Sequence, residues 1–191
     1  MFKARRKYFS FILIFFFAQA TTVFPGELLN ILVSGQAKGL IKIELNSKIA
    51  PNHVERIKYL AGKGLYDNIV FHRVIDGFMA QTGDVQYGNK NKYYPEQVGR
   101  GGSTLPDLGA EFSKEKFLAG TLGMARSSNP NSANSQFFIM FKEASHLNNK
   151  YTIVGRVLEG MDVLLSIKKG DIKKNGTVEE PDYMKKVFIG N

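Results

Sequence analysis

An arginine, Arg73, interrupts the largely apolar segment Phe71-His72-Arg73-Val74-Ile75, which ends in the turn-forming dipeptide Asp76-Gly77. Because an unpaired buried guanidinium costs several kcal/mol, such a residue lies at a surface or in a cleft, or it has a partner. Two interpretations are therefore open. Arg73 is either an edge-strand residue that pairs with Asp76, or a cleft residue with a chemical task.

Other side chains that carry out catalysis are poorly arranged in this sequence. The three histidines, His53, His72 and His146, are widely spaced and fit no metal-binding motif. No Gly-x-Ser-x-Gly motif marks a nucleophilic serine, and the absence of cysteine excludes disulfides and thiolate chemistry. We therefore expect structural or solvated roles for these residues, and neither a metal nor a cofactor, while both interpretations of Arg73 stay open.

A second segment, residues 123–139, runs from small residues through a polar turn into Ser135-Gln136-Phe137-Phe138-Ile139. Together, FHRVIDGFMAQTGD (71–84) and MARSSNPNSANSQFFI (124–139) resemble the cyclophilin family of peptidyl-prolyl cis-trans isomerases. Both motifs are long and occur in the family's order. The likeness extends from about Leu40 to Val157, and more loosely to the C-terminus.

The resemblance implies a site made of a catalytic arginine, Arg73, beside an apolar pocket. Four residues would line the pocket for the proline ring: Phe78, Met79, Phe138 and Leu147. Three would contact the substrate backbone or orient the arginine: Gln81, Ala125 and Gln136. Without the resemblance, the same apolar residues would be assigned to the core, and the glutamines to strand positions hydrogen-bonded to neighbours.

Three further residues of the implied substrate site depart from the family's usual pattern. Arg126 replaces an asparagine that often contacts the substrate backbone. His146 stands where many eukaryotic relatives have Trp, and Tyr151 stands where they have His. Because an imidazole offers less aromatic area than an indole, the resemblance implies only weak binding of cyclosporin.

The activity that the resemblance implies is acceleration of rotation about X–Pro peptide bonds, with proline-containing polypeptides as partners. A donor aimed at the prolyl nitrogen would bind the twisted transition state better than either planar state. We expect a monomeric isomerase that assists the folding of exported proteins. The alternative is a chaperone or scaffold that binds proline-containing segments and for which catalysis is incidental.

Short apolar segments between turn signals indicate a mainly β protein. Eight strands are expected, at 28–33, 40–45, 71–75, 78–81, 120–125, 137–141, 151–158 and 184–189. Two helices are expected, one opening at Ala50-Pro51 and one at Gly160. The resemblance sharpens this to a closed eight-stranded antiparallel β-barrel capped by a helix at each end, in one domain spanning 21–191.

The charge of the chain gives little support for a nucleic-acid partner. The sequence has 26 basic and 17 acidic residues, and four of the basic residues fall in the first seven positions. Without those four, 22 basic residues face 17 acidic ones, a net charge of +5. The remaining lysines are scattered and form no basic stripe interleaved with stacking aromatics, so we expect solvated surface lysines.

The first 20 residues have the order of a secretory signal peptide. Met1 to Lys7 is basic, Phe9 to Ala18 is apolar, and Ala18-Gln19-Ala20 offers a small-x-small cleavage site. The alternative is an uncleaved membrane anchor, but the apolar block falls well short of the ~20 residues that span a bilayer. We therefore expect a periplasmic or secreted protein without a membrane span after cleavage.

The exported protein is predicted to begin at or near Thr21, directly after the cleavage site. Intact mass or N-terminal sequencing of the exported form measures this. Recovery of a full-length, membrane-bound chain would contradict the prediction.

Overall fold

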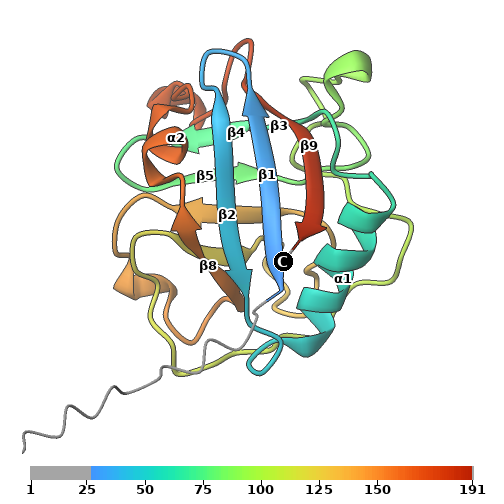
Figure 1. Ribbon diagram of the computed structural model, residues 1–191, viewed down its shortest axis with the longest axis vertical. Helices are drawn as coiled ribbons and strands as arrows, with labels where there is room; N and C mark the ends of the chain where they lie inside the picture. Colours follow the sequence, from blue (N-terminus) through green and yellow to red (C-terminus); the bar gives the residue numbers. More distant parts are fainter. Residues whose placement is uncertain (1–26, 191) are drawn as a thin grey trace, which may run out of the picture.

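The computed structural model describes residues 27–190, and within them the chain forms nine strands and two α-helices (Figure 1). The strands are β1 Leu28–Ser34, β2 Gly39–Leu45, β3 Ile69–Val70, β4 Arg73–Ile75, β5 Met79–Thr82, β6 Thr121–Met124, β7 Phe137–Met140, β8 Ile153–Glu159 and β9 Tyr183–Gly190. The helices are α1 Pro51–Gly62 and α2 Met161–Ser166, with 3-10 turns η1 Lys90–Lys92, η2 Ser145–Leu147 and η3 Ile172–Lys174.

All nine strands belong to one sheet in the order β3-β9-β1-β2-β8-β6-β7-β5-β4. The sheet curls, so that β1, β2 and β9 cross in front of β4 and β5 (Figure 1). The prediction of a closed eight-stranded barrel is wrong, because the structure is a curled half-barrel with β3 and β4 as its edges. Those edges are consecutive in the chain, but β3 pairs with β9 and β4 pairs with β5, so they lie at opposite ends of the strand order.

The expected strand at 71–75 is shortened to β4, residues 73–75, and a separate short strand, β3, precedes it at 69–70. Both sides of the break contact the C-terminal part of the chain. The Phe71 amide donates to the carbonyl oxygen of Asp182 (2.8 Å), and the Val74 amide donates to that of Gly176 (2.8 Å). The segment 170–177 therefore lies along β4 where a further strand would be needed to close a barrel. The other seven predicted strands are confirmed with small shifts of their ends.

The two predicted helices are confirmed, and they pack on different parts of the sheet. Helix α1 begins at Pro51, buries the predicted stripe that includes Val54, Ile57 and Leu60, and contacts β9. The Glu111 carboxylate accepts hydrogen bonds from the amides of Asn52 (3.2 Å) and His53 (3.1 Å) in its first turn. Helix α2 contacts β2 on the other side of the molecule (Figure 1).

The buried apolar residues form two clusters, one on each face of the β5–β7 part of the sheet. Because side chains alternate along a strand, Ala80, Phe137 and Ile139 join the large main cluster inside the curl. Their neighbours Met79 and Phe138 join a smaller cluster on the opposite face. That smaller cluster has seven buried members: Met79, Phe117, Phe138, Met140, Ala144, Leu147 and Ile153.

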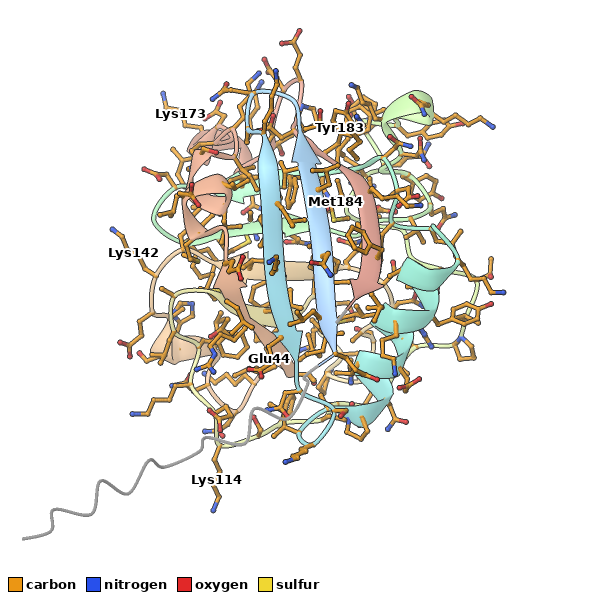
Figure 2. The ribbon with its side chains drawn as sticks, in the orientation of Figure 1. Glu44, Lys114, Lys142, Lys173, Tyr183 and Met184 are labelled. Atoms are coloured by element: carbon orange, nitrogen blue, oxygen red, sulfur yellow. The ribbon has the colours of Figure 1, made fainter. Side chains whose placement is uncertain are left out.

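Two further predictions concern the surface and the leader. Figure 2 shows Lys114, Lys142 and Lys173 projecting outward at separate places, consistent with scattered solvated lysines. Within residues 27–190, no helix is long and apolar enough to cross a membrane. The predicted leader, residues 1–20, lies outside the described residues and stays a prediction.

A buried carboxylate, Asp84, holds the loop that follows β5. One oxygen accepts hydrogen bonds from the amides of Gln86 (3.1 Å) and Tyr87 (2.9 Å). The other accepts from the amides of Gly99 (2.7 Å) and Gly101 (3.0 Å). A Cβ atom at Gly101 would lie 2.4 Å from the Asp84 carboxylate, so this approach requires glycine.

Replacing this carboxylate by an amide, Asp84→Asn, is expected to lower the free energy of unfolding by about 1–3 kcal/mol. The new NH₂ group would face backbone N–H donors that have lost their acceptor. Urea denaturation measures the change. Asp76→Asn is the matched control, because Asp76 is exposed in the β4–β5 turn. Equal stability of the two variants would contradict the assigned role of Asp84.

Candidate active site

The register of the sheet places the key residues in one row across four strands. Arg73 of β4 pairs with Gln81 of β5, Gln81 pairs with Phe138 of β7, and Phe138 pairs with Gly123 of β6. Directly paired residues project from the same face of a sheet, so Arg73, Gln81 and Phe138 stand side by side. A Cβ atom at Gly123 would lie 2.6 Å from the Phe138 ring, so only glycine leaves the ring room.

Above this row lies a pocket of about 370 Å³, which we call the central pocket. This volume falls in the range of small-ligand sites. Ten of the eleven predicted site residues line it: Arg73, Phe78, Met79, Gln81, Ala125, Arg126, Phe138, His146, Leu147 and Tyr151. The eleventh, Gln136, lines a neighbouring pocket.

The floor of the central pocket is apolar and its rim is aromatic. Met79, Phe138 and Leu147 are buried, at 2%, 6% and 8% exposure, and they belong to the smaller apolar cluster. On the rim, His146 stacks on Phe78 with ring centroids 5.7 Å apart. The Tyr151 ring meets Phe138 edge to face at 5.8 Å. These residues are thus packed outside the main core and face a cavity.

The guanidinium of Arg73 is held by neutral oxygen atoms. Its Nε donates to the main-chain carbonyl oxygen of Asn175 (2.9 Å), and its Nη2 donates to the side-chain Oδ1 of the same residue (3.0 Å). Its Nη1 donates to Oε1 of Gln81 (3.2 Å). Arg73 therefore lies in an edge strand, as one interpretation predicted, but the pairing with Asp76 that this interpretation also predicted is wrong. Among the described residues no carboxylate forms an ion pair with Arg73.

A chain of side-chain amides fixes the orientation of Gln81. The Nε2 of Gln81 donates to Oε1 of Gln136 (3.0 Å), and the Nε2 of Gln136 donates to the carbonyl oxygen of Gly101 (2.8 Å). Gly101 is held in turn by Asp84. Since the amide nitrogen of Gln81 is engaged, its oxygen is left to face Arg73. The glutamines therefore have the neighbours expected of residues that orient the arginine.

Arg126 lies across the rim of the central pocket. Its guanidinium carbon is 4.2 Å from the centre of the Tyr151 ring, and its Nη2 donates to the carbonyl oxygen of Lys150 (2.8 Å). Its Nη1 donates to the carbonyl oxygen of Ser127 (2.8 Å). The side chain is thus anchored by carbonyl groups and an aromatic face, and no carboxylate in residues 27–190 forms an ion pair with it.

Burial acts in the same direction on Arg73, in β4, and on His72, directly before it, but with different consequences for charge. It lowers the pKa of Arg73, an effect that the Tyr151 phenol opposes. Because the ordinary pKa of arginine lies far above neutral pH, the guanidinium stays charged at pH 7. Burial lowers the pKa of His72 to about 4, against the attraction of the Asp84 carboxylate. His72 is therefore neutral at pH 7 and adds no charge to the site.

Sequence reasoning missed Asn175, which supplies two of the three oxygens around Arg73. It lies 102 residues away in sequence and has a positive φ of 55°. The only local signal is the dipeptide Asn175-Gly176, which indicates a turn and names no partner.

No cluster of three or more potential metal ligands occurs in residues 27–190.

Comparison with known proteins gives a consistent result. The model of the family described as cyclophilin type peptidyl-prolyl cis-trans isomerase/CLD matches residues 28–189. A probable peptidyl-prolyl cis-trans isomerase from Brucella suis is 53% identical over 161 residues, covering 84% of this chain and 82% of that protein. A peptidyl-prolyl cis-trans isomerase-like 1 protein from Aspergillus oryzae is 37% identical, covering 77% and 86%.

Solved structures agree with this assignment. A cyclophilin from Hirschia baltica superposes with a TM-score of 0.69 at 29% identity, covering 85% of this chain and 73% of that one. A Cryptosporidium parvum cyclophilin-type isomerase, crystallised in the presence of the dipeptide Ala-Pro, gives a TM-score of 0.72 at 27% identity, covering 86% and 99%. The chain therefore belongs to the cyclophilin-type peptidyl-prolyl cis-trans isomerase family.

Proposed function

We propose that this chain isomerises X–Pro bonds in exported polypeptides, with Arg73 as the donor to the prolyl nitrogen and the central pocket as the seat of the proline ring. The observation that carries the proposal is the state of Arg73. Its guanidinium is charged, oriented by neutral oxygens and placed at the rim of an apolar pocket.

The barrier to be lowered is that of amide resonance, about 18–20 kcal/mol. As the X–Pro bond twists, resonance is lost and the prolyl nitrogen regains a lone pair. A hydrogen-bond donor aimed at that nitrogen stabilises the twisted state and neither planar state, which is the condition for raising the rate. No nucleophile, base or cofactor is needed for this step.

The contacts of Arg73 leave donors free for this task. A guanidinium has five N–H groups. Three of them are directed to Asn175 and Gln81, and another faces only the weakly accepting sulfur of Met79, 3.9 Å from Nη1. Within residues 27–190, two N–H groups therefore have no oxygen acceptor, while the other three hold the planar group in place.

The apolar floor supports the proposed position of the ring. Phe138, Met79 and Leu147 offer a buried surface to a ring of carbon atoms, while Gln81 and Arg73 stand at its edge. The Cryptosporidium parvum relative was crystallised with an Ala-Pro dipeptide, which supports a proline-containing ligand for this chain as well.

The size of the required rate increase shows that Arg73 and the central pocket must act together. Raising the rate from roughly 0.01 per second to about 100 per second requires about 5.5 kcal/mol. A hydrogen bond from a charged donor contributes about 1.5–3 kcal/mol. The remainder has to come from holding the ring still while the acyl side turns, which is the task we propose for the central pocket.

The proposal of exported clients rests on the predicted leader, residues 1–20. The alternative, a binder of proline segments with incidental catalysis, needs the apolar pocket but not an oriented guanidinium. The three hydrogen bonds that hold Arg73 therefore favour the isomerase.

Removal of the donor by Arg73→Ala is expected to lower kcat by at least about a hundredfold, or roughly 2.7 kcal/mol, with a small change in peptide affinity. Arg73→Lys keeps the charge but loses the planar fork, so it should recover only part of the activity. Exchange NMR on an X–Pro peptide gives the rate, and peptide titration gives the affinity.

Two comparison variants sharpen the result. Phe138→Ala opens the pocket floor and should damage affinity and rate together. Arg156→Ala removes an exposed arginine of β8, paired with Glu44, and should change neither. Wild-type turnover in Arg73→Ala would show that Arg73 is a surface residue and that the site assignment is wrong.

A further inference from the structure

Three pockets meet at Gln81. The central pocket adjoins a second one of about 450 Å³, the loop pocket, lined by parts of the 99–107 loop and of the 125–136 segment. A third, of about 350 Å³, lies between the edge of β4 and residues Pro95 to Arg100, and we call it the edge pocket. Gln81 lines all three. A polypeptide seated at the central pocket can therefore continue directly over either of the other two.

An arginine stands at each boundary between these pockets. Arg126 lines both the central and the loop pocket, and Arg73 lines both the central and the edge pocket. Arg100 lines both the loop and the edge pocket. The only carboxylate that lines any of the three is Asp107, whose Oδ1 accepts a hydrogen bond from Asn134 (2.9 Å). The residues that line the three adjoining pockets thus include three cations and one anion.

The charges of these arginines are not cancelled by their contacts. Arg73 and Arg126 donate to amide and carbonyl oxygens, which orient a guanidinium without neutralising it. Arg100 is exposed, and within residues 27–190 its side chain has neither a hydrogen bond nor an ion pair. Of the three arginines, Arg100 is therefore the one whose guanidinium N–H donors are all available to a ligand.

We infer that this site selects proline segments that carry an acidic side chain within about three residues of the proline, and that Arg100 binds that carboxylate. The inference rests on the proposed function, because it assumes that the proline ring occupies the central pocket. An extended chain advances about 3.3–3.6 Å per residue. The loop pocket shares Gln81, Ala125 and Arg126 with the central pocket, so a side chain a few residues from the proline reaches it.

The expected effect is moderate and depends on salt. A single exposed ion pair contributes little net binding free energy, so an increase of about fivefold in kcat/KM is the most that one pair is expected to give. Because exposed charges are screened beyond about 10 Å at 0.1 M salt, the preference should shrink as salt is raised. The positive surroundings should also speed the encounter with an acidic peptide, so the gain should appear mainly in KM.

The test uses peptides with a single proline and one variable residue, Glu, Gln or Lys, placed in turn at each of the three positions before and after the proline. Exchange NMR gives kcat/KM for each peptide. We expect Glu to exceed Gln by about fivefold in at least one position at low salt, with Lys below Gln. Arg100→Gln should abolish this order, and Arg100→Glu should reverse it in favour of Lys.

Arg156→Gln is the matched control, because it removes the same charge at a surface site that shares no lining residue with the three pockets. This variant should keep the preference for Glu. Asp107→Asn removes the opposing anion and should increase that preference.

The outcomes separate this inference from the proposed function. If wild type accelerates the Gln peptides but treats Glu, Gln and Lys alike at every position, the acidic preference is refuted and the isomerase site stands. If Arg100→Gln keeps the preference, Arg100 is not its source and the inference is overturned. If wild type accelerates none of the peptides, the proposed function fails and the inference fails with it.

Discussion

The arrangement of this site depends on holding the charge of Arg73 without a counter-charge. A carboxylate partner would orient the guanidinium, but it would also neutralise the charge that has to act on the substrate. The three oxygens that contact Arg73 here belong to a main-chain carbonyl and to two amide side chains. They are held in place from two directions: Asn175 belongs to the C-terminal segment 170–177, and Gln81 is oriented by the amide chain through Gln136 to Gly101.

The open edge of the sheet makes this arrangement possible. In a closed barrel, a neighbouring strand would occupy the outer side of β4. In this chain the segment 170–177 lies there, with a bridge between Arg73 and Thr177 and a hydrogen bond from the Gly170 amide to the Val74 carbonyl oxygen (2.8 Å). Because this segment is a turn-rich loop, it can direct both a carbonyl group and a side chain of Asn175 at the guanidinium. The deviation from a closed barrel is thus the feature that positions the arginine.

Local sequence signals predicted most of the strands and both helices, because the alternation in 40–45 and the stripe in 51–62 are direct consequences of burial on one face. The ten pocket-lining residues followed from the family resemblance: seven lie in the two motifs that carry it, and His146, Leu147 and Tyr151 lie beyond them. Four features could not be predicted. The shortening of the expected strand 71–75 and the role of Asn175 depend on contacts about a hundred residues away. The open sheet depends on the segment 170–177, which lies along the outer side of β4. The central position of Asp84 likewise appears only when Gly99 and Gly101 are folded back onto it.

The central claim, that Asn175 acts on catalysis only by orienting Arg73, is tested most directly by a double-mutant cycle. Asn175→Gly removes the side-chain oxygen while tolerating the positive φ of 55°. Exchange NMR would give kcat for wild type, Asn175→Gly, Arg73→Ala and the double variant. The account predicts that Asn175→Gly lowers kcat by about tenfold in the wild-type background, with peptide affinity retained, and has no further effect once Arg73 is alanine. The same loss in both backgrounds would show that Asn175 serves loop packing alone and would contradict the account.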